Sequence, residues 1–207
     1  PSKIDDYQCE TVYKDVDYQI NLKEFDIGLD GGSYKDLRYR VNHARRCGYS
    51  LAINKNVTPA HSHIIALQLI KARTYELWDY QLYLRLSDYI QRFSSPKLFN
   101  VFFDSMLIGF DVVDTLGDTL AAPLGFYMDF PSVADFATYE EIVHAKNFGF
   151  SWLDIGWACN NAGLEEFKKK WRAVPRFSVC MQEYHKTKES MQNEIASLMK
   201  VSGRMSD

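Results

Sequence analysis

Three short strand-like runs in the middle of the chain restrict the possible folds more than any other feature. They cover residues 98–104, 107–115 and 119–129, are rich in aromatic and β-branched residues, and are joined by only two or three residues each. Connections this short join antiparallel neighbours, because a parallel crossover needs about a dozen residues or more. The sequence therefore predicts an antiparallel meander at the centre of a sheet.

Helix and strand patterns alternate on both sides of this meander. Apolar residues alternate along residues 17–28, and the glycine-rich turn that follows leads to Ser33, which is predicted to cap a helix. Thr58 and Pro59 fit the start of another helix. Helices on a mixed sheet with an antiparallel centre give an α/β or α+β sandwich with helices on both faces. The other predicted strands are 49–54, 151–157 and 176–184, and the predicted helices lie within 33–47, 58–93, 131–148, 163–171 and 186–200.

Length and composition predict one domain and exclude some classes of function. With 207 residues, we expect a single domain over residues 1–185 and a C-terminal helix with a frayed tail over 186–207. The net charge of −3 argues against a protein that holds nucleic acid by bulk electrostatics. No apolar run approaches the roughly 18 residues that span a bilayer, the first residues are polar, and the four cysteines are far apart. These features predict a cytoplasmic protein.

The segment 126–177 resembles the C-terminal half of the GNAT-like domains in the Fem family, the peptidoglycan-bridge aminoacyltransferases. It is also similar to the transferase domain of phosphatidylglycerol lysyltransferases. The resemblance rests on an Ala-Lys-x-x-Gly helix end, an Asp-x-Gly strand end and a Gly-Leu-x-x-Phe-Lys helix with an aromatic residue four positions after the phenylalanine. An upstream basic helix that leads into a strand adds to it. The matching residues are Leu37, Arg38, Asn42, Gly48, Ala145, Lys146, Gly149, Asp154, Gly156, Gly163, Leu164, Phe167, Lys168 and Trp171.

This resemblance implies a GNAT-like fold and the transfer of an acyl or aminoacyl group to an amine acceptor. The donor would be a co-substrate, either aminoacyl-tRNA, an acyl carrier protein or acyl-coenzyme A, and no permanently bound cofactor is expected. Enzymes that use coenzyme A usually have a glycine-containing loop whose N–H groups hold the pyrophosphate at a helix N-terminus. Residues 131–137 occupy that place here, without glycine and with an acidic residue. The alternative is a non-catalytic GNAT-like binding module, or a fragment of a larger transferase.

Three residues are candidates for catalysis. By resemblance, Lys168 lies near the reacting centre, where a cation offsets the charge of a tetrahedral intermediate. Asp129 and Asp154 lie toward the ends of predicted strands, and either one could bind the amine or accept its proton. A simpler interpretation exists for each: a solvated helix face for Lys168, a turn before Pro131 for Asp129, and a backbone cap for Asp154.

Other residues are candidates for binding the donor or the substrate. Tyr127 ends the third strand of the meander, where the GNAT fold separates its strands for the acyl donor. Phe167 is alternatively a core residue, and the two asparagines that follow the 151–157 strand form either a turn or donors to a carbonyl. Arginines on the first predicted helix form a basic patch that suits phosphates of tRNA or of a carrier, or else a solvated face. No histidine pair has metal-ligand geometry, so no metal is assigned. The binding candidates are Tyr127, Asn160, Asn161, Phe167, Arg38, Arg45 and Arg46.

Overall fold

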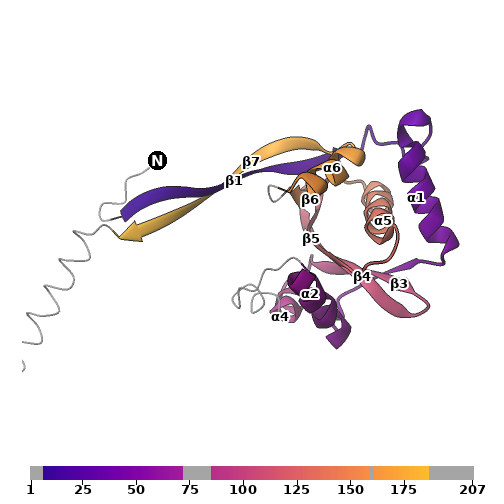
Figure 1. Cartoon of the computed structure of the whole chain (residues 1–207), viewed down its shortest axis with the longest axis horizontal. Coiled ribbons are helices and arrows are strands. Elements are labelled where there is room, and N and C mark those ends of the chain that lie inside the picture. Colours follow the sequence, from indigo (N-terminus) through magenta and orange to yellow (C-terminus); the bar gives the residue numbers. More distant parts are fainter. Residues whose placement is uncertain (1–6, 72–84, 159–160, 187–207) are drawn as a thin grey trace, which may run out of the picture. The chain divides into compact units, whose positions relative to one another are not determined.

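The computed structural model describes residues 7–71, 85–158 and 161–186. Strands and helices follow one another as the sequence predicts (Figure 1). In chain order they are β1 (Tyr7–Asn21), the 3-10 turn η1 (Gly32–Tyr34), α1 (Lys35–Arg46), β2 (Ser50–Asn54), α2 (Pro59–Lys71), α4 (Leu86–Arg92), β3 (Lys97–Phe103), β4 (Met106–Leu116), β5 (Thr119–Tyr127), α5 (Val133–Asn147), β6 (Trp152–Trp157), α6 (Ala162–Lys170) and β7 (Val174–Lys186).

The strands form a seven-stranded mixed sheet in the order β2-β3-β4-β5-β6-β1-β7. The antiparallel meander is confirmed, since β3 pairs with β4 and β4 pairs with β5, both antiparallel. β5 and β6 run parallel, with α5 as the crossover between them. β6 then pairs antiparallel with β1.

The pairing between β5 and β6 covers only three residues of each strand. It joins Thr119–Ala121 to Trp152–Asp154 and then ends. Pro123 follows in β5 and has no N–H group to offer a neighbouring strand. Gly156 in β6 has a φ of 73°, a left-handed conformation that takes its strand out of the regular extended path. These two residues end the ladder, and β5 runs on to Tyr127 without β6 beside it.

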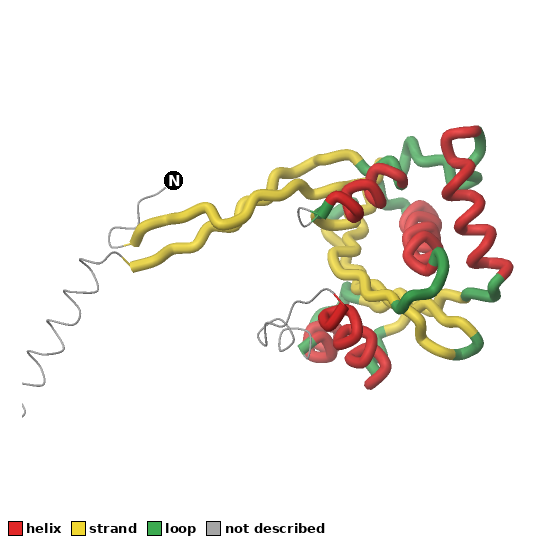
Figure 2. The backbone as a smooth tube through the Cα atoms, viewed as in Figure 1, coloured by secondary structure: helices red, strands yellow, loops and turns green. Residues whose placement is uncertain are grey.

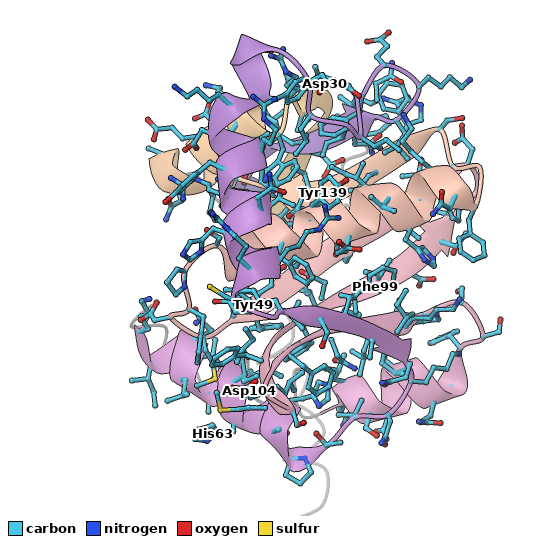
Figure 3. The ribbon with its side chains drawn as sticks, turned by 90° about the vertical axis from the view of Figure 1, so that its right-hand side faces the viewer. Asp30, Tyr49, His63, Phe99, Asp104 and Tyr139 are labelled. Atoms are coloured by element: carbon cyan, nitrogen blue, oxygen red, sulfur yellow. The ribbon has the colours of Figure 1, made fainter. Side chains whose placement is uncertain are left out.

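Helices cover both faces of the sheet (Figures 1 and 2). α2 and α4 pack on one face, where Ile64, Ile90 and Phe110 belong to one buried cluster. α5 packs on the opposite face, where Phe136 and Val101 belong to a second cluster. α1 lies across α5 in this second layer (Figure 3).

Two compact units make up the chain. Residues 17–176 form the larger one, which contains all the helices described above. The described part of the smaller unit comprises residues 7–16 of β1 and 177–186 of β7. None of the helices in the described ranges has the length and apolar character that crossing a membrane requires. The predicted C-terminal helix lies almost wholly outside the described residues, and so does the middle of the long helical region.

Several boundaries differ from the sequence-based prediction, and the first strand already begins at Tyr7 and not at residue 17. The first strand ends at Asn21 and not near residue 28, because the Asn21 side chain accepts the N–H of Lys23 and its carbonyl accepts the N–H of Phe25, which starts a turn. Ser33 does not cap α1. It lies inside the 3-10 turn that precedes the helix, and Tyr34 occupies the capping position without a side-chain hydrogen bond.

Replacing Gly156 by alanine is expected to lower the free energy of unfolding by about 1–2 kcal/mol, the cost of placing a Cβ in a left-handed conformation. The alanine Cβ would lie 3.5 Å from the Pro123 carbonyl oxygen, an ordinary contact, so backbone strain dominates. Urea unfolding of the two proteins measures the difference. Gly32→Ala is the control, because a Cβ there meets open space. Equal losses in both variants would contradict the explanation.

Candidate active site

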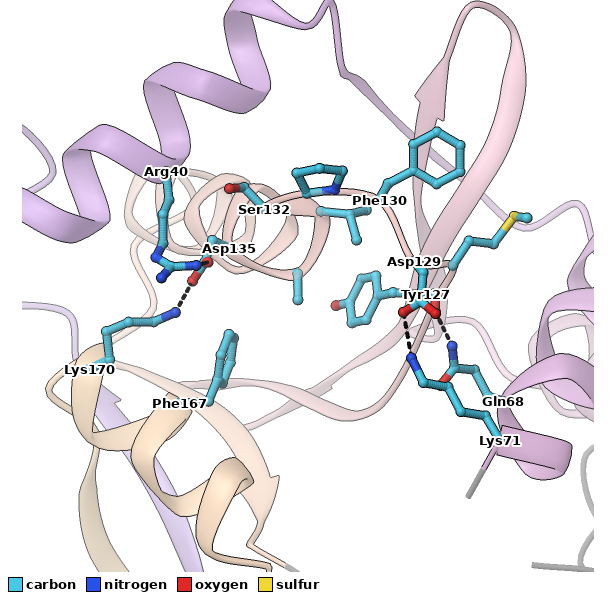
Figure 4. Close-up of a pocket in the computed structure, with 14 residues that line it drawn as sticks. Arg40, Gln68, Lys71, Tyr127, Asp129, Phe130, Ser132, Asp135, Phe167 and Lys170 are labelled. Atoms are coloured by element: carbon cyan, nitrogen blue, oxygen red, sulfur yellow. Dashed lines mark hydrogen bonds and ion pairs between the residues drawn. The ribbon is translucent and has the colours of Figure 1, made fainter. Parts of the chain in front are cut away.

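A cleft of about 560 Å³ opens beside the end of β5 (Figure 4). Its wall runs from the last residue of β5, through the connecting loop, into the first turn of α5. One charged cluster lies at each end, with Tyr127 and Phe167 between them. The lining residues are Arg40, Gln68, Lys71, Tyr127, Met128, Asp129, Phe130, Pro131, Ser132, Val133, Ala134, Asp135, Phe167 and Lys170.

Asp135 organises one end of the cleft. Its carboxylate is buried in the first turn of α5, with 4% of the residue exposed. Lys170 Nζ lies 2.5 Å from one carboxylate oxygen, and an Arg40 guanidinium nitrogen lies 3.7 Å from the other. The indole Nε1 of Trp171 also donates to Asp135, at 3.2 Å. This single carboxylate therefore holds α1 and α6 against the start of α5.

The other end is more open to solvent. The Asp129 side chain is 81% exposed and pairs with the Lys71 ammonium group. Gln68, also on α2, donates to the backbone carbonyl of Tyr127. α2 therefore supports the end of β5 from the side opposite α6.

The loop between β5 and α5 is held both by a local hydrogen bond and by a hydrogen bond from a distant part of the chain. Phe130 N–H donates to the Met128 carbonyl at 2.7 Å, and the Tyr49 hydroxyl donates to the Pro131 carbonyl at 3.1 Å. Ser132 has a φ of 62°, a left-handed conformation that turns the chain into α5. The first N–H groups of a helix have no partner within it, and they carry the positive end of the helix dipole. The cleft therefore adjoins a place that favours negative charge.

Tyr127 connects the cleft to a buried pair of carboxyl groups. Its hydroxyl donates to Asp111 on β4, and Asp111 shares a hydrogen bond with Glu141 on α5. Asp111 and Glu141 are 4% and 2% exposed. Burial raises the pKa of Asp111 to about 7, against the opposing effect of its hydrogen bonds. Burial and the nearby Asp111 charge raise the pKa of Glu141 well above its usual range. One of the two is therefore protonated at neutral pH.

Three of the predicted site residues line the cleft, namely Tyr127, Asp129 and Phe167. Asn161 instead caps α6, where its side chain accepts the N–H groups of Gly163 and Leu164. Asn160 lies outside the described residues.

Asp154 and Lys168 belong to a separate buried polar cluster. The Lys168 ammonium group donates to the Ile155 carbonyl on β6, which ties α6 to the sheet. Asp154 accepts the N–H of Gly156 at 2.7 Å, and Gln19 donates to both Asp17 and Asp154. Burial, and then the charge of Asp154, raise the pKa of Asp17 to about 6. These two predicted catalytic residues therefore lie together, but neither lines the cleft.

The predicted basic patch lies along one side of α1. Arg38, Arg45 and Arg46 surround one shallow groove. Arg38 donates to the Leu29 carbonyl, Arg46 donates to the carbonyl of Asn42 on its own helix, and Arg45 pairs with Glu140 at 3.3 Å. The groove is lined by Lys35, Arg38, Tyr39, Asn42, Arg45 and Arg46.

Sequence reasoning missed Arg40, Lys170, Asp111 and Glu141. Arg40 and Lys170 look like members of charged helix faces, and only the fold brings both to Asp135. Asp111 carries a usable signal, because it interrupts an apolar strand in a predicted central position, where a carboxyl group needs a partner.

Among the described residues, no group of three histidine, cysteine or acidic side chains has the arrangement of a metal site. His61 and His63 point to different environments, since His61 is buried and His63 is exposed. His61 Nε2 lies 2.9 Å from Asn100 Oδ1, and its Nδ1 accepts the Thr58 N–H at 3.0 Å. These contacts give His61 a structural role at the start of α2.

The buried pair should make stability fall as pH rises. In the unfolded chain both carboxyls ionise near pH 4, so between about pH 4 and 7 the folded protein holds more protons than the unfolded chain. The free energy of unfolding must then decrease with pH across this window. For Asp111 alone the decrease is on the order of 4 kcal/mol, from 1.36 kcal/mol per pKa unit.

Asp111→Asn should remove the part of this decrease that Asp111 contributes, while the raised pKa of buried Glu141 keeps the rest. Urea unfolding at pH 4.5 and 7.5 gives the pH-dependent difference for each protein. Glu166→Gln, at an exposed position on α6, is the control and should keep the wild-type difference. The same difference in Asp111→Asn as in wild type would show that Asp111 ionises normally.

A scan against profiles of known protein families finds no match, and no curated protein matches the sequence. Solved structures do match. The C-terminal domain of a putative lysylphosphatidylglycerol synthetase from Agrobacterium fabrum superposes with a TM-score of 0.56 at 17% identity, over 86% of this chain and 60% of that one. FemX gives 0.54 at 10% identity, over 87% and 63%. A tandem GNAT protein from the clavulanic acid biosynthesis pathway gives 0.55 at 10% identity, over 87% and 55%.

This chain thus spans less than two thirds of each of these three structures. Identities this low establish the fold alone. The mixed sheet, its antiparallel centre and the helices on both faces are those of a GNAT-like protein. The chain therefore has the GNAT-like fold that its sequence motifs predict.

Proposed function

We propose that this protein is an acyltransferase that moves an acyl or aminoacyl group from an activated donor to an amine by direct attack. The position of the cleft carries this proposal. It lies where β5 continues without β6, next to the first turn of α5. The family resemblance implies that the acyl donor binds at this separation of strands. The shared fold of FemX and of a lysylphosphatidylglycerol synthetase domain supports the same class of reaction.

The end of the cleft near Asp135 suits the anionic part of the donor. Lys170 and Arg40 bring two positive charges there; Lys170 pairs with the buried Asp135, and Arg40 pairs mainly with the exposed Asp36, which an anionic ligand can displace. The start of α5 adds the positive end of a helix dipole. Because the Asp135 carboxylate occupies the first turn of α5, we expect this end to bind a pyrophosphate less tightly than a glycine-containing loop would. We therefore favour aminoacyl-tRNA or an acyl carrier protein over acyl-coenzyme A as the donor.

The opposite end suits the amine. The Asp129 carboxylate is largely exposed and can exchange Lys71 for the ammonium form of an acceptor. The hydroxyl group of Tyr127 lies between the two ends of the cleft (Figure 4). A reaction by direct attack needs the donor carbonyl and the amine to be aligned and the amine proton to be removed, and it needs no covalent enzyme intermediate.

Lys168 and Asp154 contribute to this arrangement from outside the cleft. Lys168 ties α6 to the Ile155 carbonyl on β6. α6 carries Phe167 and Lys170 into the cleft, so this bond sets the position of both. We assign Lys168 and Asp154 to positioning.

A donor screen tests the proposed function. Acyl-coenzyme A, acylated carrier protein and aminoacyl-tRNA are each added to the protein, and the melting temperature is followed, since a ligand that binds only the folded state must raise it. Transfer of a radiolabelled acyl group to an amine is then measured with the donor that binds. Binding without transfer would favour a non-catalytic module, and no binding with any donor would contradict the proposal.

Lys170→Gln should weaken donor binding about tenfold or more, since a charge-assisted hydrogen bond contributes roughly 1.5–3 kcal/mol. Lys169→Gln is the matched control, because Lys169 is the adjacent residue, is 62% exposed and pairs only with Glu165 among the ion pairs of the described residues. The melting shift as a function of donor concentration gives both affinities. Equal affinities in the two variants would place the donor elsewhere.

The groove along α1 is proposed to contact phosphates of a macromolecular donor. Arg38→Glu combined with Arg46→Glu should then abolish donor binding at moderate salt and reduce its salt dependence. Lys23→Glu combined with Arg92→Glu, at two exposed positions outside the groove, is the control with the same change in net charge. Filter binding or fluorescence anisotropy at two salt concentrations measures both. Unchanged binding in the double variant would favour a small donor that reaches the cleft alone.

A further inference from the structure

We propose that Tyr127, Asp111 and Glu141 form a proton relay that accepts the proton of the attacking amine at the floor of the cleft. The inference rests on the proposed acyl transfer and deepens it. Tyr127 is the catalytic residue, because it lines the cleft. Asp111 and Glu141 act through it.

The geometry is that of a chain leading from the cleft into the interior. The Tyr127 hydroxyl donates to Asp111 Oδ1, and Asp111 in turn shares a hydrogen bond with Glu141. Within the described part of the chain, Asp111 Oδ2 and Glu141 Oε1 are buried without a hydrogen-bond partner. The pair thus places buried carboxyl oxygens next to the hydroxyl of a tyrosine that lines the cleft.

Two glycines make room for this chain. Gly109 is opposite Tyr127 in the β4–β5 ladder, and Gly125 is opposite Asp111. A Cβ at Gly109 would collide with the Tyr127 ring, and a Cβ at Gly125 would collide with the Asp111 carboxylate and crowd Tyr127. Only glycine at both positions lets the tyrosine and the carboxylate lie side by side.

The surroundings favour one shared proton. The groups that face Asp111 are Tyr127 from β5, Glu141 from α5 and the apolar Phe99, its partner on β3. The charges that act on Tyr127 are those of Asp111, Glu141 and Asp135, which are all acidic. With no cation among these groups, two buried carboxylates cannot both stay ionised. Glu141 holds a proton and donates it to the Asp111 carboxylate.

The amine nitrogen attacks the donor carbonyl carbon, so that a C–N bond forms and the bond from that carbon to the carrier oxygen or sulfur breaks. The nitrogen gives its proton to Tyr127 Oη while the Tyr127 proton moves to Asp111. The carrier leaves as an alkoxide or thiolate and takes a proton from water. Asp111 afterwards returns its proton through Tyr127 to solvent.

A purely structural role is the competing explanation. Burying two carboxyl groups gives little stability, because apolar residues of similar volume often serve as well or better. A structural pair would also not need a hydroxyl that reaches the cleft. The test must therefore include readouts that a structural pair would leave unchanged.

The first measurement is the pH dependence of transfer in wild type, Tyr127→Phe, Asp111→Asn and two Glu141 variants. Wild-type transfer should rise with pH through about 7, where Asp111 loses its proton. Tyr127→Phe and Asp111→Asn should lower kcat by about 10²–10⁴-fold and lose this rise, while donor binding stays as in wild type. Glu141→Gln should lose less than Glu141→Ala, because the amide still donates to Asp111.

Tyr139→Phe is the matched control. Its hydroxyl is also bound within the fold, to the Ile27 carbonyl at 2.9 Å, and Tyr139 does not line the cleft. It should keep the wild-type pH profile. Carbon NMR of labelled aspartate and glutamate is a second readout that does not depend on activity. It should show that Asp111 titrates near neutrality and that the pKa of Asp111 is higher in Tyr127→Phe.

The outcomes separate this inference from the proposed function. Transfer by wild type that persists with the same pH profile in Tyr127→Phe and Asp111→Asn would overturn the relay and leave the acyltransferase intact. No transfer by wild type with any donor would overturn both. Ordinary ionisation of Asp111 and Glu141 by NMR would overturn the relay whatever the activity.

Discussion

The early end of pairing between β5 and β6 is the constraint on which the rest of the site depends. Three paired residues hold the two strands together, and Pro123 and Gly156 then prevent a regular ladder. If the pairing continued, β6 would lie beside the end of β5 and the wall of the cleft would close. The fold therefore gives up hydrogen bonds at one edge of a strand in order to expose Tyr127 and the loop after it.

Four helices converge on the opening that results. α5 begins at its rim, α6 brings Phe167 and Lys170, α1 brings Arg40, and α2 brings Gln68 and Lys71. Asp135 is the common partner of Arg40, Lys170 and the Trp171 indole. The same carboxylate that holds α1, α5 and α6 together also lowers the positive charge available to a donor. The negative charge of Asp135 therefore stabilises the packing of these helices and at the same time weakens the binding of an anion in the cleft.

The sequence predicts the order of elements and the antiparallel meander, because these follow from local periodicity and short connections. It also points to Tyr127, Asp129 and Phe167, which lie near motif positions. It does not predict Arg40 or Lys170, since their approach to Asp135 depends on how distant helices pack. For Lys168 the opposite is true. The sequence motif points to it as a site residue, but its ammonium group donates to a carbonyl of β6 and does not face the cleft.

Gly125 has a consequence for how such a protein changes over generations. Its lack of a side chain is needed by Asp111 and Tyr127, and the position itself is exposed. A replacement there would displace the Asp111 carboxylate and press on Tyr127, which itself packs against one of the two buried clusters. If the proposed relay operates, one mutation at this exposed position would remove it, which is a short evolutionary route from a transferase to a binding protein that keeps the fold.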